Sequence, residues 1–149
     1  MITIEHTIDI PAAPADVWRT VTDTASYEAW NPFVPQLEGD LAPGSRITVT
    51  VRPGTKTMTF RPTLDAVDAE TVIRWRGKLG VRGIFDGVHE LSLEPMPDGG
   101  TRFTQRETFS GVLVPFLRRI VEDTAAGFAD MNVALRDRVV ATTRDGAGR

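Results

Sequence analysis

Three side chains that can hold or exchange protons are predicted to share one face of two neighbouring strands. His89 lies in a strand expected over residues 84–94, and Gln105 and Glu107 lie in the next strand, expected over 101–109. Because side chains alternate between the two faces of a strand, all three point to the side that carries leucine and phenylalanine. The sequence therefore predicts a small polar group within an otherwise apolar layer.

The pairing of these two strands decides which of the polar side chains meet. If Glu94 pairs with Arg102 across the connecting loop, then His89 faces Glu107. Directly opposed side chains lie about 5 Å apart at Cβ, so these two are within reach of each other. A register shifted by two residues would instead place His89 against Gln105 or Phe109.

An imidazole beside a carboxyl group in an apolar cavity suits two functions. His89 and Glu107 are candidate catalytic residues for proton transfer, since burial and a neighbouring imidazole set the protonation of the carboxyl group. Together with Gln105 they are also candidates for orienting a ligand. The alternative without a function is that these polar side chains form hydrogen bonds with one another at a solvent-exposed end of the sheet. We favour a function, because three polar groups on an inward face cost free energy without a purpose. Of the two functions, we favour ligand orientation over catalysis.

Neither a metal centre nor a cofactor is predicted. His6 falls on the inward face of the first strand, where a histidine is more often a core or rim residue than a ligand. His6, His89 and Glu107 have the residue types of a metal site, but no spacing shows that they converge. The chain has no cysteine, which excludes thiolate zinc sites and cysteine nucleophiles. It also has no phosphate-binding loop and no nucleophile-elbow serine.

Length and composition predict a single cytoplasmic domain. The 149 residues are enough to bury a core without disulfides. A net charge of −3 gives no electrostatic basis for nucleic-acid binding. We expect neither a signal peptide nor a membrane-spanning segment, since no apolar run is long enough. The domain is expected over residues 1–142, followed by a flexible tail over 143–149.

Residue patterns place these side chains on an ordered set of elements. A strand over 2–10 precedes two short helices, over 15–21 and 23–29. Period-two alternation and closely spaced Pro-Gly turns then indicate antiparallel strands rather than parallel βαβ units. The glycine-rich segment 77–83 is a candidate lid. The later strands are expected over 34–40, 46–52, 57–67, 71–79, 84–94 and 101–109.

After Gly111 the apolar residues recur every three or four positions, which predicts an amphipathic helix of about 25 residues. Gly127 within this helix permits a bend or a close approach. Asn132 either reaches the rim of a cavity or lies on the surface of the helix. The apolar stripe consists of Leu113, Leu117, Ile120, Thr124, Phe128, Met131, Leu135 and Val139.

The order of elements predicts an α+β fold in which one long helix covers one apolar sheet face. The geometric solution is a helix-grip arrangement, with a curved six- to seven-stranded antiparallel sheet wrapped around the C-terminal helix. Two short helices follow the first strand. Such a sheet commonly leaves a cavity between itself and the helix.

Several segments together resemble the SRPBCC superfamily of START-like and birch-pollen-allergen-like proteins, in particular its bacterial polyketide cyclase/dehydrase-like branch. These segments cover almost the whole chain, and they specify a fold better than a function. They are IDIPA at 8–12, VW at 17–18, YEAWNPF at 27–33, GVHELSLEP at 87–95, GGTRF at 99–103, ETFSG at 107–111 and GFADMN at 127–132.

The resemblance implies a cavity that binds a small hydrophobic molecule, lipid-like, aromatic or polyketide-like, and a chain that acts as a monomer or weak homodimer. A cyclase or dehydratase that uses Glu107 and His89 as an acid–base pair is the alternative, and an interaction module ranks last because the outer sheet face is polar. The expected ligand-binding residues are Trp30, Phe33, Met58, Phe60, Trp75, Phe85, His89, Leu91, Gln105, Glu107, Phe109, Leu117, Phe128 and Met131.

Overall fold

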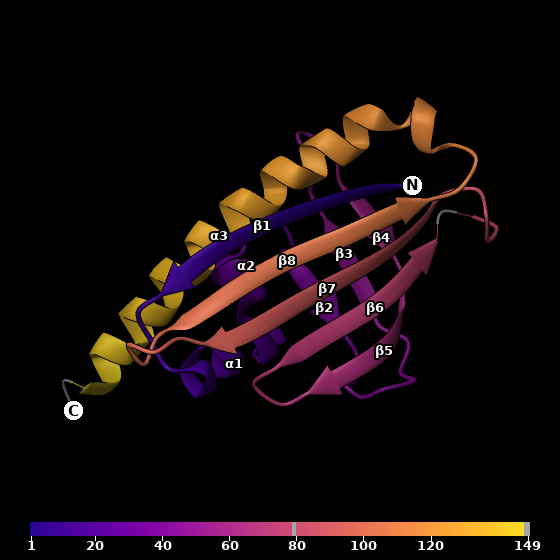
Figure 1. Cartoon of the computed structure of the whole chain (residues 1–149). Coiled ribbons are helices and arrows are strands. Elements are labelled where there is room, and N and C mark those ends of the chain that lie inside the picture. Colours follow the sequence, from indigo (N-terminus) through magenta and orange to yellow (C-terminus); the bar gives the residue numbers. More distant parts are fainter. Residues whose placement is uncertain (79, 148–149) are drawn as a thin grey trace.

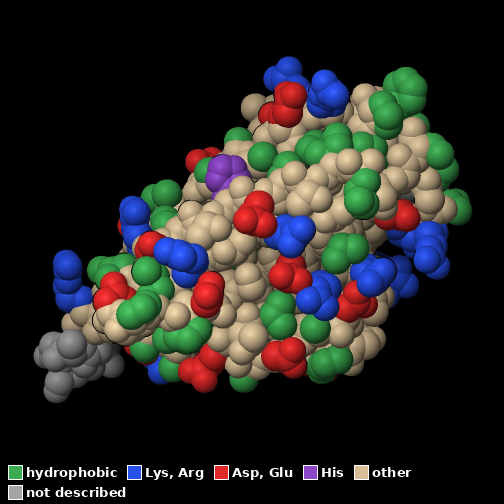
Figure 2. All heavy atoms as spheres, viewed as in Figure 1, with side chains coloured by type: hydrophobic (Ala, Val, Ile, Leu, Met, Phe, Trp, Pro, Cys, Tyr) green, Lys and Arg blue, Asp and Glu red, His purple; other side chains and the backbone are tan. Residues whose placement is uncertain are grey.

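A five-stranded antiparallel sheet, seen face-on in Figure 1, forms one side of the molecule in the computed structural model, which describes residues 1–78 and 80–147. The first strand of the chain lies at one edge, and the order across the sheet is β1-β8-β7-β6-β5. Charged side chains of both signs are interspersed over its outer face (Figure 2). The strands are β1 (Ile2–Ile10), β5 (Thr63–Asp68), β6 (Val72–Lys78), β7 (Asp86–Pro95) and β8 (Thr101–Ser110).

A separate three-stranded sheet comprises β2 (Gln36–Glu38), β3 (Thr48–Val51) and β4 (Met58–Phe60). The sequence predicted one strand over 57–67, but the structure divides it into β4 and β5. Pro62 lies at the break, where a residue without an N–H group cannot continue a ladder. An isolated bridge between Arg46, which lies just before β3, and Thr63 of β5 connects the two sheets.

The long helix α3 (Arg118–Ala147) packs against the concave side of the five-stranded sheet, along β1 in particular (Figure 1). It begins later than the apolar stripe predicted, because Val114–Phe116 form a separate 3-10 turn, η2, that contains Pro115. Leu117 follows with a non-helical backbone, so Leu113 and Leu117 precede the helix. At its other end α3 includes most of the segment predicted as a tail, and residues 148–149 lie outside the described part.

Three short helical segments connect β1 to the second sheet. They are α1 (Pro14–Thr22), the 3-10 turn η1 (Thr24–Ser26) and α2 (Tyr27–Trp30). The predicted α+β class, with short helices after the first strand and one long C-terminal helix, is confirmed. The strand predicted over 71–79 ends as β6 at Lys78, and Leu79 lies outside the described residues.

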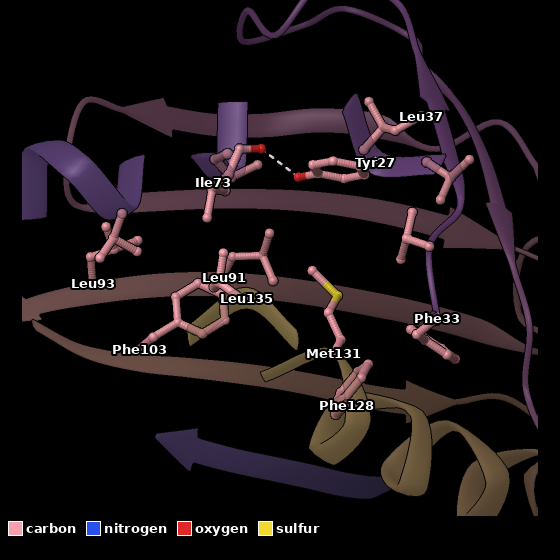
Figure 3. Packing of buried hydrophobic residues seen from close by; sticks show 14 of the residues in the cluster. Tyr27, Phe33, Leu37, Ile73, Leu91, Leu93, Phe103, Phe128, Met131 and Leu135 are labelled. Atoms are coloured by element: carbon pink, nitrogen blue, oxygen red, sulfur yellow. Dashed lines mark hydrogen bonds between the residues drawn. The ribbon is translucent and has the colours of Figure 1, made fainter. Parts of the chain in front are cut away.

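The apolar interior consists of two clusters rather than one. The larger cluster fills the space between α1, α3 and the middle of the sheet, and Figure 3 shows Phe103, Leu91 and Leu135 packed within it. The smaller cluster, at the end of the sheet where β7 begins and β8 ends, consists of Phe85, Phe109, Val114 and Val121. The space between these two clusters is where the candidate site lies.

Candidate functional site

A cavity of about 100 Å³ separates the two apolar clusters. Its walls come from both sheets and from the first turns of α3. Most of the lining is apolar, and the polar side chains include His89 and Glu107. The lining residues are Phe33, Val51, Pro53, Met58, Thr59, Phe60, Trp75, Gly77, Lys78, Phe85, Gly87, His89, Glu107, Phe109, Ile120 and Thr124.

The observed register of β7 and β8 opposes His89 to Glu107, as predicted from the Glu94–Arg102 pairing. The nearest atoms of the two side chains, Nδ1 of His89 and Oε1 of Glu107, are 3.9 Å apart. This distance is too long for a direct hydrogen bond. The two groups therefore stand side by side on the cavity wall without neutralising each other.

A chain of hydrogen bonds leads from His89 away from the cavity. Nε2 of His89 lies 3.1 Å from Oε1 of Gln105, and Nε2 of Gln105 donates to Oδ1 of Asn132 at 2.8 Å. Nδ2 of Asn132 donates in turn to the backbone carbonyl of His6 at 3.1 Å. All three side chains are buried, so this relay fixes the imidazole in one orientation.

The His89 ring is held between two aromatic side chains. Its centroid lies 4.6 Å from the ring of Trp75 and 4.8 Å from that of Phe128. Only 4% of His89 is exposed, and burial lowers its pKa to about 4, although the hydrogen bond with Gln105 acts in the opposite direction. The imidazole is therefore neutral at pH 7.

The carboxyl group of Glu107 lies directly over Gly87 on the neighbouring strand. A Cβ atom at position 87 would come within 2.5 Å of Oε2, so only glycine leaves room for the carboxyl group in this place. The side chain is 15% exposed, and burial raises its pKa to about 8. At pH 7 the group is predominantly a carboxylic acid, which can donate one hydrogen bond and accept others.

A proton donor and a proton acceptor thus occupy one wall of an apolar cavity. The protonated Glu107 is the donor, and the neutral His89 offers a ring nitrogen as acceptor. Such a pair can hold a polar group of a bound molecule, and it has the protonation states that general acid–base catalysis requires. No group of three histidine, aspartate or glutamate side chains that could hold a metal ion occurs among residues 1–78 and 80–147.

Phe33 reaches the cavity because the chain turns sharply after α2. Oδ1 of Asn31 accepts hydrogen bonds from the backbone N–H groups of Phe33 and Val34, at 3.1 and 2.8 Å. The Phe33 ring then rests on Gly127 of α3, where a Cβ atom would lie 2.1 Å from the ring. Gly127 therefore serves the close approach that the sequence left open, and Phe33 forms a wall of the cavity.

The loop between β6 and β7, predicted as a lid, is attached to the segment after β8. The backbone N–H of Val112 donates to the carbonyl of Gly83 at 3.1 Å, and that of Leu113 donates to Ile84 at 2.9 Å. Within the same segment Gly77 and Lys78 line the cavity. On β6, Arg74 pairs with Glu90, and the exposed Lys78 marks the cavity mouth.

The structure brings together many of the predicted ligand-binding residues and places the others elsewhere. Leu91 and Met131 belong to the larger apolar cluster, and Leu117 packs against the smaller one. Phe128 and Gln105 lie behind the wall, in contact with His89. Trp30 borders a different surface hollow, beside Arg138 of α3. The predicted residues that line the cavity are Phe33, Met58, Phe60, Trp75, Phe85, His89, Glu107 and Phe109.

Sequence patterns did not predict half of the residues that line the cavity. They also left open whether Asn132 reaches the cavity rim or lies on the surface of the helix. The structure buries Asn132 where α3 meets β1, and its side chain donates to the backbone carbonyl of His6. The two glycines of the wall could have been found, since glycine inside a strand often marks close approach of another group. The lining residues not predicted are Val51, Pro53, Thr59, Gly77, Lys78, Gly87, Ile120 and Thr124.

The sequence family described as "Polyketide cyclase / dehydrase and lipid transport" matches residues 1–140. No functionally curated protein matches the sequence. No helix in the described part of the chain combines the length and apolarity that crossing a membrane requires.

Solved structures with this fold include proteins of several kinds. A protein from Mesorhizobium loti shares 19% identity and a TM-score of 0.75, over 95% of this chain and 98% of its own. A START superfamily protein from Mycobacterium smegmatis shares 18% identity and a TM-score of 0.71, over 94% and 98%. A norcoclaurine synthase variant from Thalictrum flavum, bound to a transition-state analogue, shares 16% identity and a TM-score of 0.74, over 95% and 96%. At these identities the likeness concerns the fold.

Proposed function

The chain belongs to the polyketide cyclase/dehydrase and lipid-transport family, within the START-like SRPBCC superfamily, and from this we propose that it binds a small hydrophobic molecule between its sheet and α3. The superfamily binds hydrophobic ligands and includes polyketide cyclases. A lipid-like, aromatic or polyketide-like molecule suits the cavity walls. The observation that carries the proposal is the gap between two apolar clusters, which is lined by aromatic side chains from both sheets.

The size of the cavity limits how much of a ligand is enclosed. Its volume of about 100 Å³ is far more than the ~10–15 Å³ that one water molecule needs. It is smaller than the 300–1,000 Å³ that is typical of sites for drug-sized ligands. We therefore expect one ring or a short chain segment to be enclosed, with any larger remainder extending past Met58 and Lys78 at the mouth.

Native mass spectrometry of protein purified without denaturation tests this proposal. Ile120 faces the cavity from α3, so Ile120→Trp fills the space that a ligand needs. Val133 on the same helix is 44% exposed, so Val133→Trp is the matched control. We expect a bound mass, or saturable binding of added toluene, in the wild type and the control but not in Ile120→Trp. Equal binding by all three proteins would contradict the proposed location.

An enzyme of the cyclase or dehydratase type is the second candidate, and one observation favours it. The donor Glu107 and the acceptor His89 lie 3.9 Å apart on the same wall, so one could protonate a substrate oxygen while the other removes a proton.

The enzymatic test uses a linear poly-β-ketone thioester, with products followed by liquid chromatography and mass spectrometry. Removal of a general acid by Glu107→Gln should slow turnover about 100-fold or more. Retention of toluene should be unchanged in the same variant, because the apolar walls are intact. Absence of any cyclised or dehydrated product from the wild type would leave binding as the function.

A further inference from the structure

The hydrogen-bond relay behind the cavity determines which nitrogen of His89 carries its proton. A backbone carbonyl can only accept, so the atom of Asn132 that faces the His6 carbonyl must be the amide nitrogen. Oδ1 of Asn132 must then accept from the amide nitrogen of Gln105. Oε1 of Gln105 is left to accept from Nε2 of His89. The proton of the neutral imidazole therefore lies on Nε2.

This tautomer leaves Nδ1 of His89 as a bare acceptor on the cavity side of the ring. Among residues 1–78 and 80–147, no hydrogen bond to Nδ1 or to the Glu107 carboxyl group is formed. The other titratable side chain of the cavity lining is Lys78 at the mouth, while α3 contributes the uncharged Ile120 and Thr124. One unused acceptor and one unused donor thus face the same space.

The spacing of these two groups selects the kind of ligand group that fits between them. Oxygen forms hydrogen bonds of ~2.8 Å, so one oxygen atom can contact both ends of a 3.9 Å gap at once. A hydroxyl group has its donor and acceptor on one atom. A hydroxyl group therefore bridges the gap with a single ligand atom, whereas an amide or a carboxylic acid uses two atoms.

We infer that Glu107 and His89 select a ligand with a neutral hydroxyl group, an alcohol, phenol or enol, which accepts a hydrogen bond from the carboxylic acid of Glu107 and donates one to Nδ1 of His89. The inference rests on the proposed function, because it requires that the cavity holds a ligand. A carboxylate would meet the Nδ1 lone pair, and an ammonium group would have to ionise the buried Glu107 first. Burial favours the neutral forms of both side chains, which agrees with the hydroxyl assignment.

Four single-ring probes that differ only in their polar group test this assignment. They are toluene, p-cresol, 4-methylbenzoate and 4-methylbenzylamine, titrated into the full-length protein at pH 6.5 by calorimetry. Two added hydrogen bonds of about 1 kcal/mol each should make p-cresol bind about tenfold or more tightly than toluene. Equal affinity of p-cresol and toluene would overturn the hydroxyl inference and leave the proposed function intact. Failure of all four probes to bind would overturn both.

Two variants of Glu107 separate the hydroxyl assignment from its charged alternatives. Glu107→Gln keeps an N–H donor, so the preference for p-cresol should persist within threefold. Glu107→Met has no donor, so the preference should fall to about threefold over toluene. If 4-methylbenzylamine binds most tightly of the four probes, and this preference disappears in Glu107→Gln, the site would be assigned to a cation instead. Tightest binding of 4-methylbenzoate would assign it to an anion.

The tautomer itself can be read by nitrogen NMR of the two histidine rings, with His6→Gln used for assignment. We expect a protonated Nε2 and a bare Nδ1 for His89 in the free protein at pH 6.5. Asn132→Ala removes the anchor of the relay, so both tautomers should then be populated. A protonated Nδ1 in the wild type would overturn the inference, whatever the probes show.

Discussion

The two ends of the space between the sheet and α3 are built from similar residues but packed differently. At the end where β8 begins, Phe103 and Leu135 are fully buried within the larger cluster. At the opposite end, Phe85 and Phe109 stack on each other with ring centroids 5.4 Å apart and border the cavity. The glycines of β6 and β7, Gly77 and Gly87, occur only at this second end of the two strands.

The comparison teaches that apolar composition does not by itself predict a filled interior. The Phe60 ring lies over Gly77 and the Glu107 carboxyl group lies over Gly87, and the cavity that these groups border is left unfilled. A close-packed region contributes stability through every methylene group, whereas a hollow region gives up part of that contribution. The cavity end should therefore tolerate changes that the packed end does not.

The largest expected effect comes from truncating a ring at the packed end. Phe103→Ala should lower the free energy of unfolding by about 3–5 kcal/mol, because it removes buried surface and leaves a closed void. Phe85→Ala should cost about 2 kcal/mol, since the ring already borders a cavity. Urea unfolding followed by circular dichroism measures both. Equal losses for the two variants would break the comparison.

Breaking the hydrogen-bond relay of His89, Gln105 and Asn132 should give the next largest loss of stability. Asn132→Ala leaves the amide of Gln105 buried without a partner, so we expect a loss of about 2 kcal/mol. Asp130→Ala, at an exposed position of the same helix, is the control and should change stability little. Chemical denaturation of both proteins measures the difference, and a loss no greater than that of the control would show that the relay adds no stability.

Gly127→Ala tests the contact by which Phe33 reaches the cavity. A methyl group there displaces the ring and should cost about 1–2 kcal/mol, despite the better helix propensity of alanine. In a Phe33→Leu background the same substitution should be neutral or stabilising. A double-mutant cycle by thermal unfolding gives the coupling energy. Additive effects would show that the two residues do not compete for space.

The last predicted effect is the pH dependence of stability at the end that contains the cavity, about 1 kcal/mol per pH unit. The pKa of Glu107 is raised from 4.5 to about 8, so in this window the folded protein holds a proton that the unfolded chain releases. Stability therefore falls as pH rises through this window. The pKa of His89 is lowered from 6.5 to about 4, so its contribution rises with pH between those values. The contributions of Glu107 and His89 oppose each other between pH 4.5 and 6.5, so the free energy of unfolding should change little there. Between pH 6.5 and 8 only the Glu107 contribution changes, so the free energy of unfolding should decline.

Glu107→Gln is the control for this pH dependence. The variant lacks the carboxyl group, so the decline between pH 6.5 and 8 should disappear, and the histidine contribution below 6.5 should be seen alone. Urea unfolding at half-unit pH intervals would show it. A decline of the same size in both proteins would place the titrating group elsewhere.

Much of the fold and part of the site followed from local patterns. Alternation predicted the inward faces of β7 and β8, and the pairing of Glu94 with Arg102 predicted that His89 opposes Glu107. The break at Pro62 was missed, because alternation continues through it on both sides.

Features that depend on how separate elements meet were harder to predict. The burial of Asn132 depends on the rotation of α3 against β1, which helical spacing does not determine. Trp30 and Phe33 were both expected at the cavity, but after the turn at Asn31 only Phe33 lines it. The location of the cavity likewise depends on which side chains are absent, whereas periodicity reports those that are present.

The contact between Gly87 and the Glu107 carboxyl group has an evolutionary consequence. A side chain at position 87 would require the Glu107 carboxyl group to leave its present place, so we expect changes at the two positions to be correlated. Homologues with a glutamate at the position of Glu107 should carry glycine at the position of Gly87, and those that replace the glycine should have a shorter or apolar residue in place of the acid. An alignment sorted by this pair would separate proteins that keep the polar wall from those whose interior has become entirely hydrocarbon.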